Sequence, residues 1–199
     1  MKIAIIGKGN VGSALGAGLK RAGHTVRFGH RDPNEPVLDA ARWGEIVILA
    51  VPYDSVRDVV QELGSAADGK VLIDVTNALG SHGELAIGFT TSAAEELQKM
   101  LPKTRVVKAF NTVFAQNQST GKVGKESLTA FVAGDDLRSR EAVMRLARDI
   151  GFEPVDVGQL RAARYLEPMA MLIIDLAFNL QMGTKMGFKL ARMQPKSPT

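Results

Sequence analysis

The strongest constraint in this sequence is its first sixteen residues, in which KIAIIGKGNVGSALG runs from Lys2 to Gly16. The first five of these, KIAII, are mostly apolar with three isoleucines, a composition typical of a buried strand. Gly7, Gly9 and Gly12 follow in the order G-x-G-x-x-G, and small, helix-compatible residues continue to Ala22. A strand, a glycine turn and a helix start are the context that a dinucleotide fingerprint requires.

Each glycine of this turn has its own physical reason in such a fingerprint. Gly7 permits the tight turn, Gly9 lets the backbone approach a pyrophosphate, and Gly12 lets the helix lie close to the strand. The backbone N–H groups from Lys8 to Val11 would then face the phosphates from a helix N-terminus. A strand-turn-helix corner without a ligand is the alternative, but the second strand expected after it favours nucleotide binding.

The end of that second strand, expected over 26–29, bears on the choice of dinucleotide. An NAD-binding domain carries an acidic residue here for the ribose hydroxyls, whereas this chain has His30 and Arg31. The guanidinium of Arg31 suits a 2′-phosphate, which it can bind through two hydrogen bonds, and a surface charge is the alternative. Asp32 lies near the spacing of the acidic residue, but we expect it at a helix N-cap before Pro33.

Strands and helices alternate through the rest of the chain. We expect strands at 45–51, 70–75, 105–110, 128–133 and 153–157, and helices at 39–43, 53–63, 92–101 and 134–150. This alternation predicts a doubly wound, mostly parallel α/β sheet, a Rossmann NAD(P)-binding domain over 1–158. The polar stretch at 115–125 is expected to be an irregular loop, a possible lid.

Several residues follow these strands and are therefore expected at the carboxyl edge of the sheet. They are Ala50, Val51, Pro52 and Tyr53 after the third strand, Thr76 and Asn77 after the fourth, and Asn111 after the fifth. Ligands of open α/β sheets bind at this edge. For Thr76 and Asn77, ordinary turn chemistry at a strand end is an equally good interpretation.

The segment 159–193 differs in character and is expected to be an apolar helical extension packed on the domain. Apolar residues fall on more than one face of a helix near 166–180, so we expect burial on both sides. Plain core packing is one interpretation, and a homodimer contact or the floor of a ring-binding pocket is the other. Glu167 and Asp175 are expected to pair with Arg161 or Arg164 or to be exposed, and a place beside the pocket is the alternative for both. The tail 194–199 is expected to be frayed.

Composition excludes several classes of protein. With no cysteine among 199 residues, the chain has no disulfide and no thiolate nucleophile, and the three histidines form no metal-spaced pair. No apolar run is long enough to cross a bilayer, and the expected first strand leaves no room for a leader, so we expect a soluble, cytoplasmic protein without membrane partners. The net charge of +4 fits either a solvated basic surface or attraction to a phosphorylated cofactor, and no nucleic-acid motif occurs.

Longer motifs carry a resemblance to a known family over nearly the whole chain. They are IAIIGKGNVGSALG, FGHRD, ILAVPYDSV, DVTNALG, VVKAFNTVFA, FVAGDDLRSREAVMRLARDIGFEPVDVGQLRAARYLEPMAMLI and LQMGTKMGFKL. The chain resembles the NADPH-dependent reductases of the deazaflavin coenzyme F-420, and is also similar to the reductase domain of the STEAP metalloreductases. The glycine turn is one residue shorter than in the archaeal enzymes, and the run from Lys108 to Thr112 is closer to the STEAP branch.

The resemblance implies NADP(H) as the cofactor, with a deazaflavin or a related flavin as co-substrate. Gly7, Lys8, Gly9, Asn10 and Val11 would hold the pyrophosphate, His30 and Arg31 the 2′-phosphate, and Ala50, Val51, Pro52, Tyr53, Thr76, Asn77 and Asn111 the ribose and nicotinamide. Hydride transfer between stacked rings needs no protein nucleophile, so no catalytic side chain is expected.

Two other functions stay open, a STEAP-like flavin or ferric reductase and a non-catalytic NADP-binding sensor. The first would use the same cofactor with a different acceptor, and the second would show no turnover with any acceptor. A carbonyl or imine reductase of the β-hydroxyacid dehydrogenase type would need a substrate domain with a catalytic lysine. The residues left after the expected sheet are too few for such a domain.

Overall fold

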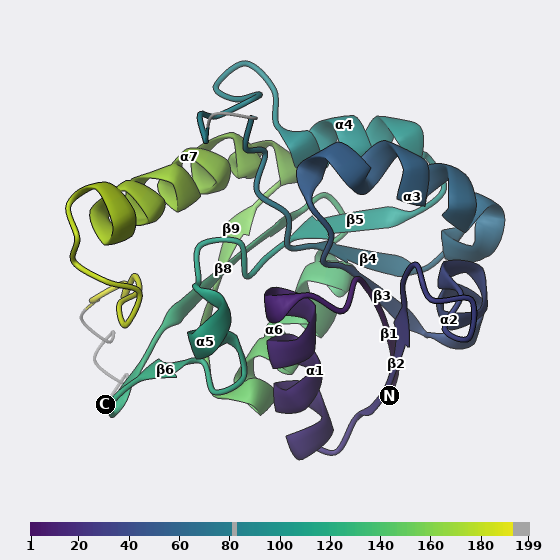
Figure 1. The fold of residues 1–199 in the computed structure, drawn as a ribbon, viewed down its shortest axis with the longest axis horizontal. Helices are drawn as coiled ribbons and strands as arrows, with labels where there is room; N and C mark the ends of the chain where they lie inside the picture. Colours follow the sequence, from purple (N-terminus) through teal and green to yellow (C-terminus); the bar gives the residue numbers. More distant parts are fainter. Residues whose placement is uncertain (81–82, 193–199) are drawn as a thin grey trace, which may run out of the picture.

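A seven-stranded sheet organises the computed structural model, which describes residues 1–80 and 83–192 (Figure 1). The strand order is β2-β1-β3-β4-β5-β8-β9, and every neighbouring pair is parallel except β5 and β8. The strands are β1 (Lys2–Ile6), β2 (Thr25–Gly29), β3 (Ile46–Leu49), β4 (Val71–Asp74), β5 (Arg105–Lys108), β8 (Thr129–Gly134) and β9 (Glu153–Gly158). The predicted doubly wound, mostly parallel α/β sheet is therefore confirmed.

Helices cover both faces of this sheet, as Figure 1 shows. On one face lie α1 (Asn10–Arg21) and α6 (Leu137–Ile150), and on the other lie α2 (Val37–Trp43), α3 (Val56–Leu63) and α4 (Ala93–Met100). Strand β1 serves both layers, because Ile3 and Ile5 pack in the core beneath α1 and α6 whereas Ala4 and Ile6 pack beneath α2 and α3. Alternation of side chains along a strand buried on both faces explains its continuous apolar sequence.

The order of the strands creates a crevice at one edge of the sheet. From β1 the chain adds β2 on one side, and it then crosses to place β3 on the other side of β1. Parallel strands that diverge in this way leave room at their carboxyl ends, where ligands of open α/β sheets bind. The ends of β1 and β3 therefore position the site described below.

The segment 115–125 is not the irregular loop that its polar sequence predicts. It forms the short helix α5 (Ala115–Gln118) and the strand β6 (Lys122–Val123), which pairs with β7 (Glu126–Ser127). Asn117 and Gln118 are buried, and the Nε2 of Gln118 donates to the carbonyls of Phe110 and Val113 at 2.8 and 2.9 Å. Gln118 thus binds backbone groups of the preceding turn and Asn117 binds backbone groups of the C-terminal segment, so a lid is no longer indicated there.

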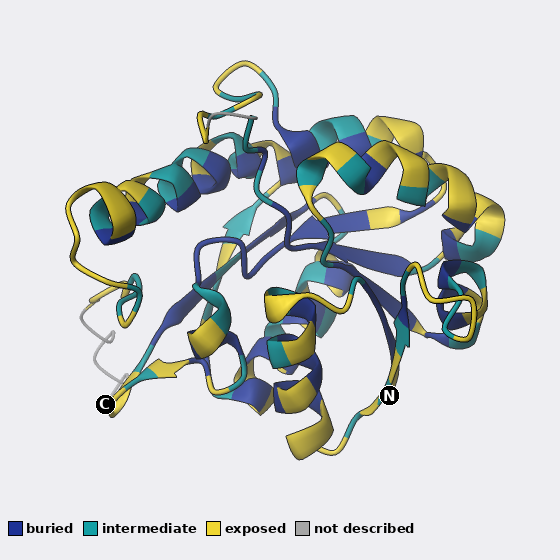
Figure 2. Cartoon of the chain, in the orientation of Figure 1, coloured by how far each residue is buried: buried dark blue, intermediate teal, exposed yellow. Residues whose placement is uncertain are grey.

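The C-terminal part begins with α7 (Ala163–Ile174) and continues in one π-helical turn, η4 (Asp175–Asn179). Leu166, Ile173 and Ala177 are buried, but Leu172 and Phe178 are 52% and 63% exposed, so the expected burial on both sides is wrong for this chain by itself (Figure 2). Buried residues recur every three or four positions from Ala163 to Ala177, so one face of α7 and η4 packs on the domain and the opposite face is left exposed.

Residues 180–192 have no regular secondary structure but are tied to the domain. Backbone carbonyls of Thr184, Met186 and Phe188 accept hydrogen bonds from the side chain of Gln116, the side chain of Asn117 and the backbone of Thr129, respectively. Among the described helices, none is long and apolar enough to cross a membrane. His82 and the tail 194–199, for which exposure and fraying are expected, lie outside the described residues.

Candidate functional site

The glycine turn after β1 has the backbone geometry that the sequence predicts. Gly7 has a φ of +104°, and a Cβ there would lie 2.1 Å from the carbonyl oxygen of Ala50. A Cβ on Gly12 would lie 2.2 Å from the carbonyl oxygen of Gly7, so both positions exclude any side chain. Gly9, the N-cap of α1, would place a Cβ in open space, and no side chain caps this helix. The first N–H groups of α1 are therefore free to bind an anion.

A cavity of about 540 Å³ lies beside this turn, at the carboxyl ends of β1, β2 and β3. The structure brings the predicted residues of these three strand ends together in its wall, namely Gly7, Lys8, Gly9, His30, Arg31, Ala50, Val51 and Pro52. Ser55, Val59 and Glu62 complete the wall from the side of α3. The volume is that of a small-molecule site, and the wall combines free backbone N–H groups with apolar side chains.

One side of this cavity carries positive charge. Lys8, His30 and Arg31 line it, and Arg31 makes no ion pair or hydrogen bond with the residues that the structure describes. Behind Lys8 and His30 lies Glu35, whose carboxylate accepts from the Lys8 ammonium at 2.7 Å and binds Nε2 of His30. The hydrogen bonds from Lys8 and then from His30 hold the pKa of the Glu35 carboxyl below its usual value. Glu35 could not be predicted from the sequence, because an acidic residue is expected at the end of the strand and Glu35 lies six residues beyond β2.

Asp32 does not cap a helix, contrary to the sequence-based expectation. Helix α2 begins only at Val37, with Pro36 as its N-cap. The Oδ1 of Asp32 accepts from the backbone N and from the Nδ2 of Asn34, at 2.9 and 3.1 Å. These bonds form a local turn that ends with Glu35 beside His30.

The other predicted residues lie outside the wall of this cavity. Asn10 and Val11 lie in the first turn of α1, Tyr53 begins the short 3-10 helix Tyr53–Ser55, and Thr76, Asn77 and Asn111 lie beyond the ends of β4 and β5. Asn77 and Asn111 bind each other, with Nδ2 of Asn111 3.2 Å from Oδ1 of Asn77 and Nδ2 of Asn77 3.1 Å from the Asn111 carbonyl. The Oδ1 of Asn111 is buried and has no hydrogen-bond partner among the described residues, so it is available as an acceptor.

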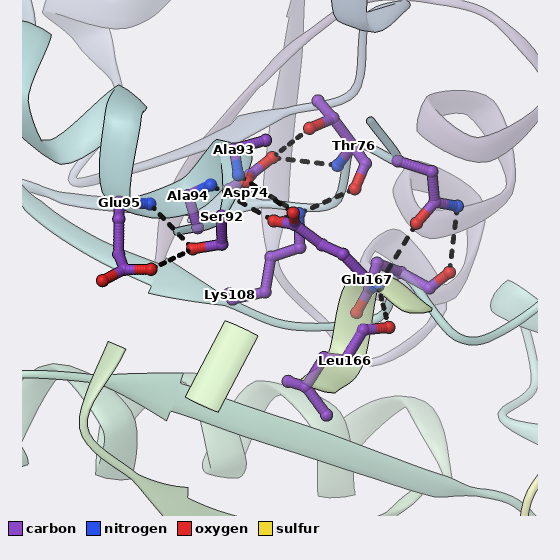
Figure 3. Close-up of polar contacts among 11 residues, drawn as sticks. Asp74, Thr76, Ser92, Ala93, Ala94, Glu95, Lys108, Leu166 and Glu167 are labelled. Atoms are coloured by element: carbon purple, nitrogen blue, oxygen red, sulfur yellow. Dashed lines mark hydrogen bonds and ion pairs between the residues drawn. The ribbon is translucent and has the colours of Figure 1, made fainter. Parts of the chain in front are cut away.

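A buried charged cluster lies next to these asparagines (Figure 3). The ammonium of Lys108, which is wholly buried, contacts Oδ2 of Asp74 at 2.9 Å, Oε1 of Glu167 at 3.1 Å and the carbonyl of Thr76 at 2.8 Å. Burial would lower the pKa of Lys108, but the charges of Asp74 and then Glu167 outweigh it and raise that pKa. The carboxylate of Glu167 is also stabilised by the start of α4, where the backbone N–H groups of Ala93 and Ala94 donate to it.

The expectation for Glu167 is therefore wrong. It neither pairs with an arginine nor faces solvent, and Arg164 instead binds Glu95, at 2.7 Å from Oε1. Asp175 is exposed and accepts from Nδ2 of Asn179 at 2.9 Å. Asn111 contacts the same turn of α7, because its Nδ2 donates to the carbonyl of Leu166, directly before Glu167, at 2.9 Å. No group of metal-ligating side chains occurs among residues 1–80 and 83–192.

Comparison with known proteins agrees with this architecture. A family model described as NADP oxidoreductase, coenzyme F420-dependent, matches residues 2–78. The F420-dependent NADP reductase of Methanothermobacter thermautotrophicus is 30% identical over an alignment of 208 positions. The alignment covers 88% of this chain and 89% of that protein. A crystal structure of a protein from Arthrobacter sp. FB24, provisionally assigned as an F420-dependent NADP reductase, superposes with a TM-score of 0.90 at 29% identity and covers 96% of this chain and all of that one.

A second group of relatives is longer. The metalloreductase STEAP3 of Rattus norvegicus is 30% identical over 189 residues, which cover 87% of this chain but only 37% of that protein. The chain therefore spans little more than a third of the length of these metalloreductase relatives.

Proposed function

Because this chain belongs to the family of F420-dependent NADP reductases, we propose that it transfers a hydride between NADP(H) and a deazaflavin or a related flavin. The observation that carries the proposal is the cavity at the ends of β1, β2 and β3, where a ligand-accessible glycine turn meets three basic side chains. Backbone N–H groups and basic side chains are the donors that a phosphorylated dinucleotide requires.

The residues of the cavity fit such a dinucleotide. Gly9 leaves open space where any other residue would place a side chain. Gly7 and Lys8 in the wall, with Asn10 and Val11 in the adjoining first turn of α1, would complete the pyrophosphate site. His30 and Arg31 would bind the 2′-phosphate, and Arg31 has no competing partner among the described residues.

The reacting end of the cofactor would lie farther along the carboxyl edge. Ala50, Val51, Pro52 and Tyr53 would line the ribose, and Thr76, Asn77 and Asn111 the nicotinamide. The Oδ1 of Asn111, which has no partner in the part of the chain that the structure describes, offers an acceptor for an N–H or hydroxyl group of the cofactor. When bound, the cofactor supplies the hydride, and this chain orients the two rings and limits the access of water. We therefore assign no catalytic side chain.

A homodimer is part of the proposal, with the extension 159–193 in the contact. Its support is the exposed apolar surface of this extension, where Leu172, Phe178, Leu180 and Met182 are each more than half exposed. Exposed apolar residues that gather on one element are typical of a protein interface. The cytoplasmic location that the sequence favours stays a prediction.

The experiment that tests the proposed function is stopped-flow mixing of the protein and NADPH with the deazaflavin or with free flavin. Loss of the visible absorbance of the deazaflavin at a saturating rate is the expected result. Fast turnover with flavin alone would favour the second candidate, a flavin or ferric reductase, which the identity to the metalloreductase STEAP3 supports. No turnover with either acceptor, despite NADPH binding, would identify an NADP-binding sensor.

A further inference from the structure

The carboxylate of Glu35 occupies the two basic groups on which the phosphate side of the cavity depends. Its Oε1 and Oε2 lie 3.0 and 2.7 Å from Nζ of Lys8, and Oε2 also binds Nε2 of His30. The backbone of the same residue adds to this contact, because the N–H of His30 donates to the Glu35 carbonyl at 2.9 Å. Glu35 therefore connects the glycine turn to the loop after β2.

The hydrogen bonds of His30 show that this contact uses donors that a phosphate would need. The backbone N–H of Asp32 lies 3.3 Å from Nδ1 of His30, which places the acceptor lone pair on Nδ1 and the proton of a neutral ring on Nε2. That Nε2–H faces Glu35. In this arrangement the imidazole has no N–H left to donate to a phosphate. The Lys8 ammonium, too, already has a carboxylate partner.

We propose that Glu35 acts as an internal competitor of the 2′-phosphate for Lys8 and His30, and so limits the preference for NADPH over NADH. The phosphate would contact Arg31 first, because that guanidinium has no partner among the described residues. It would then take over the donors of Lys8 and His30 from Glu35, which is itself about one-third exposed and so can turn toward solvent. NADH, which has no 2′-phosphate, gains nothing from this exchange. The inference rests on the proposed use of NADP(H).

Two ligands separate the contribution of the 2′-phosphate from the rest of the cofactor. Binding of 2′,5′-ADP and of 5′-AMP to the native protein and to Glu35→Gln is measured by isothermal titration calorimetry, and NADPH and NADH are measured in the same way. The variant should bind 2′,5′-ADP and NADPH at least about fivefold more tightly, since a charge-assisted competitor has been removed. Its affinity for 5′-AMP and NADH should stay within about twofold of native.

Asp39→Asn is the matched control, because it removes the same charge from the first turn of α2, and its carboxylate has no partner among the described residues. An equal gain in both variants would overturn the inference in favour of a general charge effect. Weaker binding of 2′,5′-ADP by Glu35→Gln would also overturn it, and would make Glu35 a residue that positions Lys8 and His30 for the phosphate. If the native protein does not prefer 2′,5′-ADP to 5′-AMP, the proposed NADP function fails, not the role of Glu35 alone.

Discussion

The ammonium of Lys108 lies 3.1 Å from Oε1 of Glu167, and neither side chain is exposed to solvent. Lys108 ends β5 in the sheet, whereas Glu167 lies in α7, so this ion pair joins the C-terminal extension to the edge where the candidate site lies. Asp74 and the start of α4 complete the cluster, as Figure 3 shows. A cluster that joins four elements can fix the position of α7 only while every member keeps its partners.

Removal of Lys108 should therefore lower the free energy of unfolding far more than loss of an ordinary surface charge. Lys108→Met leaves Asp74 and Glu167 buried without a cation, and we expect the free energy of unfolding to fall by about 3–5 kcal/mol. Urea denaturation followed by circular dichroism measures it. Lys99→Met removes a lysine that pairs with Glu96 but is 70% exposed, and it should change stability by less than about 0.5 kcal/mol. A similar, small effect of both variants would show that the buried cluster contributes little.

The raised pKa of Lys108 gives this cluster a pH dependence whose sign can be worked out. A group whose pKa is higher in the folded than in the unfolded chain stabilises the fold fully below its unfolded pKa, about 10.4 for lysine. That stabilisation is lost as the pH rises through the folded pKa. Unfolding measured at pH 9, 10 and 11 should therefore show a steeper alkaline loss of stability in the native protein than in Lys108→Met. Parallel losses in the two proteins would contradict this.

The sequence was sufficient for the sheet and for the glycine turn, because both depend on local signals. The run Lys2–Ile6 and Gly7 determine a strand and a turn almost independently of the rest of the chain. Features that depend on pairing between distant residues could not be predicted in this way. Glu167 was expected to be exposed or paired with an arginine, since nothing in its own segment shows that Lys108 will lie against it.

The same limit explains the segment 115–125. Its asparagine and glutamine residues are typical of a loop, and only the folded chain provides the backbone carbonyls that Gln118 binds. Glu35 is a further case. Its position beside the phosphate side of the cavity depends on the turn formed by Asp32 and Asn34. From the sequence, only Asp32 was considered as an acidic residue near this position, and it was expected at a helix N-cap.

Two glycines of the turn should respond to alanine in opposite ways. Gly9→Ala places a methyl group in open space next to the cavity at a φ of −76°, so the protein should fold normally but bind NADPH at least about tenfold more weakly. Gly7→Ala would bring its Cβ to 2.1 Å from the Ala50 carbonyl oxygen at a φ of +104°, and it should destabilise the fold itself. Thermal unfolding and NADPH titration of each variant separate the two effects. Undiminished NADPH affinity in Gly9→Ala would exclude this turn as the pyrophosphate site.

Arg31 should determine the choice between NADPH and NADH. Arg31→Ala removes from the phosphate side of the cavity a guanidinium that pairs with none of the residues 1–80 and 83–192. It should weaken NADPH binding by about 1–3 kcal/mol, with little change for NADH. Calorimetric titration of both nucleotides measures this difference. Arg42→Ala, which removes an exposed arginine of α2, is the control and should leave both affinities unchanged. Equal affinity of the native protein for NADPH and NADH would be incompatible with this role of Arg31.

The exposed apolar surface of the C-terminal extension predicts how the protein assembles. Phe178 is 63% exposed and packs nearly perpendicular to the Phe114 ring, with ring centroids 6.1 Å apart, so most of its surface is available to a second copy. Phe178→Asp would bury a charge in that contact, and we expect monomers where the native protein sediments as a dimer at tens of micromolar. The control is Leu137→Asp, which replaces a leucine of similar exposure (54%) at the start of α6, and it should leave the dimer intact. Ile174→Asp, one turn earlier on the same extension, should act like Phe178→Asp or make the protein insoluble. A native protein that sediments as a monomer at this concentration would remove the extension from any role in assembly.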